Sequence, residues 1–365
     1  MSAQLTKHER VMRTIRFEEI DRIALYDIFE NDGVIEYYAG EKLTVVNGDR
    51  VKGKCIGRTL DMTRMPEGPR PELVFTDDDG LEQESTRWTT WVKRRPFHDI
   101  ETLIPWIKRK IEKLNAWQPD GAFVEGMREY VLRYQAFFSV GCEVRGDLPV
   151  LILPSPVGTD YMFAPIGLDL FGLLVCYEPE LVDEWFEAQH QAELRRVHAI
   201  ADPRLTPVVL THDDIASKNG LMFSLDWLRR YEIPRLKALV EAWHAHDTIC
   251  LFHSDGNLMS ILDDLVGAGV DGLNPLETCA GMSIAEVRRL YGKKLFLTGG
   301  IDVSNLLPLG TPAEVRARCL EAIREADGRG YFLGSTTEIL PSVPAENVIT
   351  MLETPRLLAE GKIRL

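Results

Sequence analysis

Residues 247–257 read DTICLFHSDGN, an apolar run that ends in a histidine and an aspartate. The run predicts a strand that is buried on both faces, as strands of a parallel sheet are. His253 and Asp255 are two residues apart, so on an extended segment they face the same side. Gly256 follows, and then a segment predicted to be helical over 258–268. A strand, a polar loop and a helix form the repeating unit of a parallel α/β fold.

The same unit recurs six times from about residue 149 to the end of the chain. The predicted strands with their exit loops are PVLILPSP (149–156), TPVVLTHDD (206–214), DTICLFHSDGN (247–257), VDGLNPLE (270–277), KLFLTGGID (294–302) and GYFLGSTTE (330–338). The predicted helices are 179–201, 225–246 (broken or kinked near Pro234), 258–268, 283–291, 312–326 and 345–359.

The first third of the chain is less regular. IALYDIF (23–29) predicts a strand, residues 72–94 predict a β-hairpin around a DDDG turn, and residues 102–114 and 121–138 predict helices. With one further strand unrecognised here, eight strands close a (β/α)8 barrel. An open doubly wound sheet is the rival, although GxGxxG after the first strand and a Walker A sequence are both missing. We therefore predict a single (β/α)8 TIM barrel domain over residues 1–365, with a divergent N-terminal part over 1–140 that contains the hairpin.

Composition narrows the class of protein. The 365 residues are 45% hydrophobic and 27% charged, which is ordinary for a globular protein. Acidic residues outnumber basic ones by 56 to 42, and the net charge of −14 argues against a nucleic-acid partner. Neither an apolar run of membrane-spanning length nor a signal-peptide pattern is present, and the six cysteines are scattered. We therefore expect a cytoplasmic protein with reduced thiols and no membrane contact.

Polar residues follow five consecutive predicted strands, and in a parallel barrel the active site is built from these exits. His253 and Asp255, with Glu277 and Cys279 from the next strand, are candidate ligands of a catalytic zinc ion. Asp213 and Asp214 are candidate general acids or bases. Each also has a structural alternative: His253 as the partner of a buried carbonyl, the aspartates as helix caps, Glu277 as a solvated loop residue and Cys279 as a passive thiol.

Several motifs then occur in a fixed order: DD-x-A-x3-GLMFS (213–224), FHSDGN (252–257), GVDGLNPLE (269–277), L-x-GGID (297–302), LGTPAEV (309–315) and ILPSVPAENV (339–348). In this order and spacing the chain resembles the uroporphyrinogen decarboxylase superfamily. The resemblance implies a (β/α)8 barrel and one of two activities. These are the metal-free decarboxylation of uroporphyrinogen and methyl transfer to or from a corrinoid protein, usually with zinc.

The residues of the decarboxylase branch are poorly matched. That branch has an R-Q-A-G-R motif after the first strand, where this chain has Glu30-Asn31-Asp32-Gly33, and a histidine where this chain has Thr337. Asp61 is the one weak candidate for its central aspartate. An acidic mouth is a poor host for a tetrapyrrole with eight carboxylates.

The methyltransferase branch resembles H-x-C…C, with zinc on all three residues. Here His253 matches the histidine, while Asp255 and Thr337 stand where the cysteines would be. The chain can still form a metal site with mainly oxygen ligands, from His253, Asp255, Glu277 or Glu338, and Cys279. Such a site suits polarisation of an ether or phenol oxygen. The residues assigned to substrate binding are Phe29, Glu30, Asn31, Asp61, His212, Gly299, Gly300 and Asp302. Phe29, Tyr37, Tyr38, Trp88, Trp91 and Phe223 are candidates for an aromatic pocket.

We therefore expect a zinc-assisted methyltransferase component that moves a methyl group from a small donor, such as a methoxylated aromatic, to the cob(I)alamin of a corrinoid protein. The alternatives are a uroporphyrinogen decarboxylase and a non-catalytic ligand-binding barrel. The expected partners are the methyl donor and the corrinoid protein. A homodimer is one oligomeric state that we consider.

Overall fold

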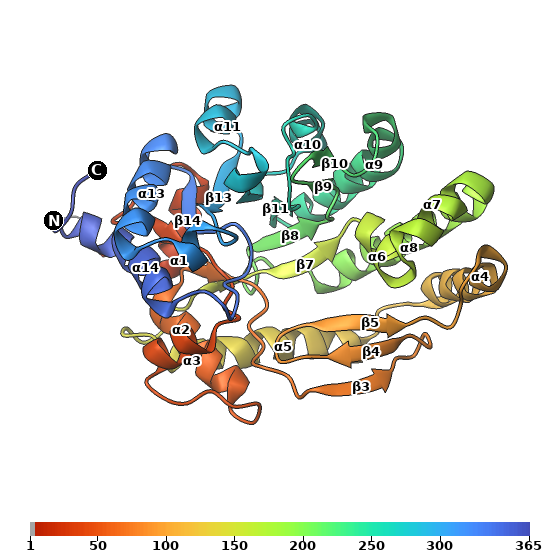
Figure 1. The fold of residues 1–365 in the computed structure, drawn as a ribbon, viewed down its shortest axis with the longest axis horizontal. Helices are drawn as coiled ribbons and strands as arrows, with labels where there is room; N and C mark the ends of the chain where they lie inside the picture. The colour runs from red at the N-terminus through yellow and green to blue at the C-terminus, as the bar shows by residue number, and fades with distance from the viewer. Residues whose placement is uncertain (1–3) are drawn as a thin grey trace.

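A computed structural model describes residues 4–365, and parallel strands form its centre (Figure 1). Seven strands hydrogen-bond in the order β1-β14-β13-β12-β11-β8-β7, and every neighbouring pair is parallel. Their bounds are β1 Ala24–Leu25, β7 Leu153–Pro156, β8 Val208–His212, β11 Ile249–His253, β12 Gly272–Leu276, β13 Phe296–Ile301 and β14 Tyr331–Ser335. The predicted strands of the last two-thirds of the chain are confirmed.

Two short strands close this sheet into a barrel. β2 (Met62–Thr63) pairs in parallel with β6 (Val150–Leu151), and only Ile152 separates β6 from β7. On its other side β2 contacts the end of β1, through the Tyr26–Met62 bridge and a hydrogen bond from the Asp61 amide to the Leu25 carbonyl. With β6 and β7 taken as one interrupted strand, the described residues form an eight-stranded ring. The predicted (β/α)8 barrel is therefore confirmed, and β2 is its unrecognised strand.

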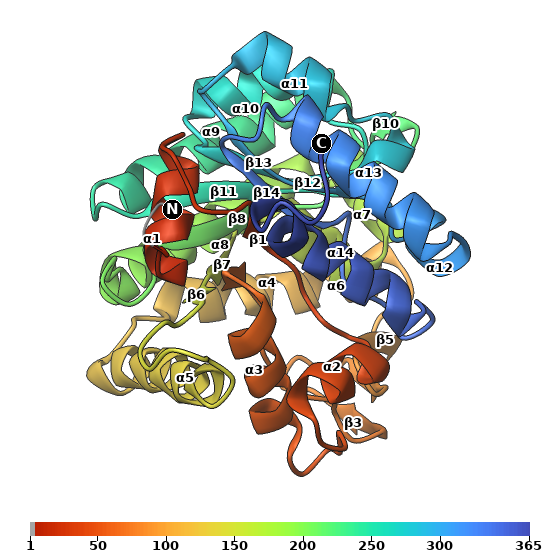
Figure 2. The ribbon, with the colours of Figure 1, turned by 90° about the vertical axis from the view of Figure 1, so that its left-hand side faces the viewer.

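Helices surround the ring (Figure 2). Those that follow the regular strands are α8 Pro179–Ile200, α9 Leu225–His244, α10 Leu262–Ala268, α11 Ile284–Tyr291, α13 Pro312–Glu325 and α14 Ala345–Ala359. Two predicted details differ from the structure. Of the predicted break or kink near Pro234, the break is absent, because α9 runs as one helix with Pro234 inside it. α10 begins four residues later than predicted, because residues 258–261 form a turn before it.

The N-terminal third contributes both barrel wall and rim. Its helices are α1 Lys7–Ile15, α2 Asp32–Ala39, α3 Gly48–Thr59, α4 Ile100–Ala116 and α5 Gly121–Ser139. In place of the predicted single hairpin, residues 73–94 form a three-stranded antiparallel sheet of β3 Leu73–Thr76, β4 Glu82–Ser85 and β5 Thr90–Arg94. The expected DDDG turn joins β3 to β4, and a second turn over 86–89 divides the run that had been read as one strand.

The β3–β5 sheet lies at the rim of the barrel mouth. Arg87 pairs with Asp32, which follows β1, and Arg95 donates to the Pro165 carbonyl, which follows β7. The latter residue belongs to α6 (Thr159–Ile166), which is followed by α7 (Leu168–Tyr177). Among residues 4–365 no single helix could cross a membrane, and only the bent pair of α6 and α7 passes by combined length and composition.

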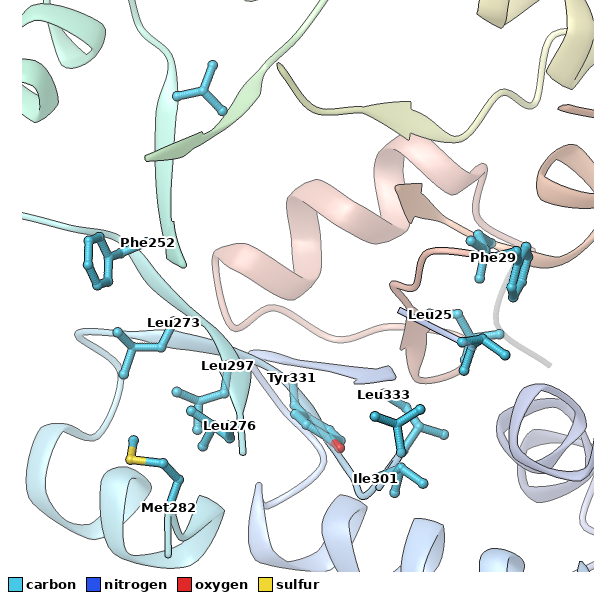
Figure 3. Packing of buried hydrophobic residues seen from close by; sticks show 14 of the residues in the cluster. Leu25, Phe29, Phe252, Leu273, Leu276, Met282, Leu297, Ile301, Tyr331 and Leu333 are labelled. Atoms are coloured by element: carbon cyan, nitrogen blue, oxygen red, sulfur yellow. The ribbon is translucent and has the colours of Figure 1, made fainter. Parts of the chain in front are cut away.

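The core has an inner and an outer part. Outward-facing strand residues such as Leu273, Leu297 and Leu333 pack between the strands and the helices (Figure 3). The inner part fills the amino end of the barrel with Leu251, Phe296, Phe332 and their neighbours, against Val11 and Phe17. Because α1 contacts β1, β6 and β14, it closes this end. The other end of the barrel is where a ligand can enter.

Candidate active site

The site consists of the inward-facing strand residues that come directly after the apolar residues filling the barrel. Alternate residues of a strand share a face, so the inward positions after Leu210 and Leu251 are His212 and His253. By the same rule Arg64 follows Met62, and Asn274 follows Gly272. Tyr26, which directly follows β1 and bridges to Met62, completes this polar layer. Parallel strands end at one edge, so residues far apart in sequence meet at the mouth.

His253 is held in one tautomer. Its Nδ1 lies 2.7 Å from Asn274 Oδ1, and the Asn274 amide nitrogen donates to Thr298 Oγ1 at 2.5 Å. A carbonyl oxygen can only accept, so Nδ1 carries the proton and Nε2 presents a lone pair. Burial, with the charge of Arg64 second, lowers the pKa of His253 to about 4. His253 is therefore a neutral imidazole, the form that ligates metals.

Two carboxylates face the free nitrogen of His253. Ligand atoms of Asp214, His253 and Asp255 all lie within 4.8 Å of one another, with His253 Nε2 3.8 Å from Asp214 Oδ1. Asp214 Oδ1 also accepts the Asp255 amide at 3.0 Å. Asp255 Oδ1 is buried without a hydrogen-bond partner in the described part of the chain, so the predicted helix-cap role is not seen. Burial, then the charges of Asp214 and Glu338, raise the pKa of Asp255 to about 7.

The other three predicted metal ligands bind elsewhere. Glu277 Oε2 accepts the Gly256 amide at 2.6 Å, and its Oε1 accepts Cys279 Sγ at 3.2 Å. Glu338 pairs with Arg64 at 3.3 Å and accepts the Thr337 hydroxyl at 2.5 Å. Glu277 and Cys279 thus stabilise the loop that carries Asp255. The third residue of the cluster with His253 and Asp255 is Asp214.

A second acidic group adjoins this cluster. Asp213 caps α6 by accepting the Gly158, Thr159 and Asp160 amides at 2.7, 2.6 and 3.1 Å. Burial, then the charges of Glu232 and Asp160, raise the pKa of Asp213. His212 Nδ1 lies 3.7 Å from Asp160 Oδ2. Asp213 therefore caps α6, which is the structural alternative predicted for it, and His212 and Asp160 face each other at the mouth.

Asp61 is the clearest misplacement among the predicted substrate residues. It precedes β2 and therefore lies at the closed end of the barrel, away from the mouth. Its carboxylate accepts from Arg10 and Arg22, both at 2.7 Å, and from the Leu25 amide at 2.8 Å. Asp61 is completely buried. It is an internal ion-pair residue that ties α1 to the first two strands.

The other predicted substrate residues, except His212, have local structural contacts. Phe29 is core, Asn31 caps α2, and Asp302 accepts the Ser304 and Asn305 amides. Gly299 and Gly300 have φ of 92° and 94°, and a Cβ on Gly300 would lie 2.6 Å from Ile284. Their role is close packing. Glu30 is buried, and burial followed by the charge of Glu338 raises its pKa.

The predicted aromatic pocket does not form. Tyr37 and Trp91 are 62% and 64% exposed. Trp88 lies under Lys52, and Phe223 stacks on Trp227 with centroids 4.4 Å apart in a separate cluster. These side chains are distributed over different parts of the fold.

Four mouth residues escaped the sequence analysis: Tyr26, Asp27, Arg64 and Asn274. Tyr26 and Asp27 end the apolar run of the first strand, but the exit was placed three residues later. Arg64 follows a strand of two residues, which is too short to recognise. Asn274 lies within a predicted strand, and its inward direction was the available signal.

Asp27 gives the site a testable pH dependence. Burial raises its pKa from 3.8 to about 7, against hydrogen bonds from Ser335 and the Ile28 amide. The folded state therefore binds more protons than the unfolded state between these values, and stability falls as pH rises from about 4 to about 7. Asp27→Asn is expected to remove this loss, which at about 1.36 kcal/mol per pKa unit is about 4 kcal/mol in full and about 3 kcal/mol between pH 5 and pH 8. Denaturant unfolding at pH 5 and pH 8 measures it.

The control for this experiment is Asp226→Asn on the surface of α9. It is expected to leave the difference between the two pH values as in the wild type. Equal pH dependence in Asp27→Asn and wild type would show that Asp27 does not hold a proton at neutral pH.

Residues 207–356 match the family model described as uroporphyrinogen decarboxylase (URO-D). A uroporphyrinogen decarboxylase of Gloeobacter violaceus is 27% identical over 141 residues, which cover 37% of this chain and 38% of that protein. One from Synechococcus is 37% identical over 101 residues, 28% of each chain. The matches thus span about a third of these curated relatives. The matched segment carries the motifs of the predicted resemblance, which is confirmed there.

A structural comparison extends the likeness to the whole barrel. A methyltransferase from Methanosarcina mazei superposes with a TM-score of 0.69, over 97% of this chain and 99% of that one. The sequence identity is 18%, so this likeness shows the shared fold.

Proposed function

We propose, from a uroporphyrinogen decarboxylase family domain over residues 207–356 and a methyltransferase-like fold, that this protein is a zinc-assisted methyltransferase component. It moves a methyl group from a small donor, such as a methoxylated aromatic, to the cob(I)alamin of a corrinoid protein. The observation that carries the proposal is the cluster of His253, Asp255 and Asp214 at the barrel mouth, with His253 oriented by Asn274.

The three residues fit a divalent cation. They offer one imidazole nitrogen and two carboxylates, all donors that zinc accepts. The buried Asp255 oxygen without a partner and the neutral His253 agree with a bound cation. His253 also has the outer hydrogen bond that orients ligating histidines. When bound, zinc supplies Lewis acidity at an ether or phenol oxygen, and oxygen-rich ligation makes it a stronger Lewis acid than thiolate ligation.

The remaining side chains position the reaction. Asn274 and Thr298 fix the imidazole, and Glu277 holds the loop of Asp255. Loss of a methyl group would leave negative charge on the donor oxygen, which would then need a proton. His212, 3.7 Å from Asp160 at the mouth, would supply it.

The open mouth is also where a corrinoid partner must approach, because α1 closes the other end. Exposed apolar side chains lie at the rim on the β3–β5 sheet: Leu73, Val74, Phe75 and Trp91. Val74 and Trp91 lie on one face of this sheet, and Leu73 and Phe75 lie on the other. Exposed apolar side chains are typical of protein-binding surfaces. They support, on this proposal, docking of a partner beside the mouth.

Uroporphyrinogen decarboxylation is the second candidate, favoured by the names of the curated relatives. Against it, the mouth is lined mainly by carboxylates. Asp61, the sequence candidate for the decarboxylase aspartate, lies at the closed end.

A direct assay separates the two activities. Zinc-loaded protein is incubated with cob(I)alamin and methoxylated benzoates, and methylcobalamin formation is followed by absorbance. Uroporphyrinogen is tested in parallel for carbon dioxide release. Methylcobalamin formation supports the proposal. Carbon dioxide release without methyl transfer contradicts it. If neither product forms, the remaining reading is a non-catalytic ligand-binding barrel.

Asn274→Ala tests the orientation of His253. Loss of the hydrogen bond to Nδ1 frees the ring, and loss of such an outer partner typically lowers metal affinity by about 10- to 100-fold. Competition against a chromophoric chelator measures zinc affinity. Asn219→Ala is the matched control, because Asn219 lies in the exposed turn between the short strands β9 (Ala216–Ser217) and β10 (Gly220–Leu221). An unchanged zinc affinity in Asn274→Ala would exclude the cluster as the zinc site.

A further inference from the structure

We propose that Arg64 and Tyr26, on the inner wall beside the His253 cluster, form a binding site for the carboxylate group of a small ligand. Both residues line one small cavity together with His253, Asn274 and Thr337. They come from neighbouring strands, since Tyr26 bridges to Met62 and Arg64 is the next inward residue after Met62.

Arg64 has unused hydrogen-bonding capacity. Its side chain is 14% exposed, and its Nε is buried without a partner in the described residues. Its best contact is a 3.3 Å pairing of Nη2 with Glu338, and Nη1 lies 3.5 Å from the weak acceptor Met65 Sδ. A guanidinium carries five N–H donors in a fork that matches a carboxylate. A buried donor that lacks a partner is costly, so a missing acceptor is indicated.

Tyr26 supplies a second unused donor. The residue is 3% exposed, and its hydroxyl has no partner within residues 4–365. Burial raises the pKa of Tyr26 to about 12, so it stays a phenol that can donate. A side-chain interaction between Arg64 and Tyr26 is among the causes that shift the pKa of each group, so the guanidinium lies beside the phenol oxygen, and the phenol O–H is still free to donate. One bound carboxylate would satisfy both donors.

The alternative is that Arg64 only offsets the acidic mouth. In that case its donors would be used by the nearby carboxylates. Instead Asp255 Oδ1, whose charge acts on Arg64, is itself without a partner, and Glu338 takes one long contact. The guanidinium therefore lies near the carboxylates, but most of its N–H donors are not used by them.

The site selects a small carboxylate-bearing ligand over a neutral one. The cavity has room for about one water-sized group, about 10 Å³, so it admits one carboxylate oxygen while the rest of the ligand lies in the open mouth. That this ligand is the methyl donor, a methoxylated aromatic acid, rests on the proposed function. The anion site itself does not.

The experiment measures benzoate and benzamide binding by calorimetry to zinc-loaded and to metal-free protein. Wild type is expected to prefer benzoate in both forms. Arg64→Gln is expected to weaken benzoate by about 10- to 100-fold, as loss of a hydrogen bond to a charged group does, with benzamide unchanged. Arg64→Lys keeps the charge and is expected to be intermediate. Tyr26→Phe is expected to weaken benzoate by a smaller factor.

Arg204→Gln, 87% exposed and far from the mouth, is the control and is expected to bind as wild type. Thermal melting confirms that each variant is folded. Benzoate binding that is absent in wild type, or unaffected by both Arg64 variants, overturns the site. Benzoate binding that requires zinc and is unchanged by the Arg64 substitutions would place the carboxylate on the metal, and this also overturns the proposed site. Arg64-dependent benzoate binding without methylcobalamin formation keeps the site and rejects the proposed function.

Discussion

His253→Ala is expected to abolish zinc binding and methyl transfer, the largest functional effect of any single substitution in this protein. The substitution removes the one imidazole of the cluster and leaves Asp214 and Asp255 as mutually repelling carboxylates. Loss of an outer-shell partner alone costs about 10- to 100-fold in metal affinity or activity, so loss of the ligand is expected to exceed 100-fold. Plasma mass spectrometry of chelator-free protein, with the methylcobalamin assay, measures both effects.

The control for His253→Ala is His98→Ala, because His98 is 81% exposed and lies outside the barrel mouth. Its zinc content and activity are expected to equal those of the wild type. About one zinc per chain in His253→Ala would contradict the assigned site. Wild-type protein that takes up no zinc would reject the zinc mechanism altogether.

Asp61→Ala is expected to have the largest effect on stability. Two arginines, one of them only 3% exposed, would lose their shared carboxylate, and the Leu25 amide would lose its acceptor. Removing one partner of a buried ion pair costs about 3–5 kcal/mol, because the other charge stays buried and unpaired. The free energy of unfolding in denaturant measures the loss.

This prediction also separates a structural Asp61 from a catalytic one. Although burial opposes it, the charges of Arg22 and Arg10 hold the pKa of Asp61 below its usual value. The ion pair therefore contributes stability above the ordinary carboxyl pKa, and this is lost as pH falls through the lower folded value. Asp202→Ala, which removes an exposed pairing with Arg204, is the control and is expected to unfold near wild type. Wild-type stability with lost activity in Asp61→Ala would instead indicate a role in chemistry.

The regular part of the fold was predictable from local pattern. β8 and β11 to β14 are short apolar runs, and the helices after them carry ordinary start signals, such as the Thr311 and Glu314 capping box of α13. Strands buried on both faces must be apolar throughout, so their sequence reveals them. The motifs between them gave the family resemblance, which lies in the segment that the family model matches.

The first third was less predictable because its elements are short or exposed. β2 has two residues, and no periodicity can be read from so few. In the β3–β5 sheet nearly every position is at least partly exposed, so the alternation that marks a half-buried strand is absent. The second turn of this sheet, at 86–89, was therefore read as part of a strand.

The sequence by itself determined that His253 and Asp255 share one face at a strand end, because alternation along a strand is a local property. It also determined the barrel, through the repeat of apolar strand and helix. Only the tertiary structure decided which carboxylate joins them, since Asp214 and Glu277 follow the strands on either side and their hydrogen bonds differ. It likewise placed Arg64 at the mouth and Asp61, three residues earlier, at the closed end. The physical reason is that a strand carries its residues across the barrel, and its direction is known only when its neighbours are.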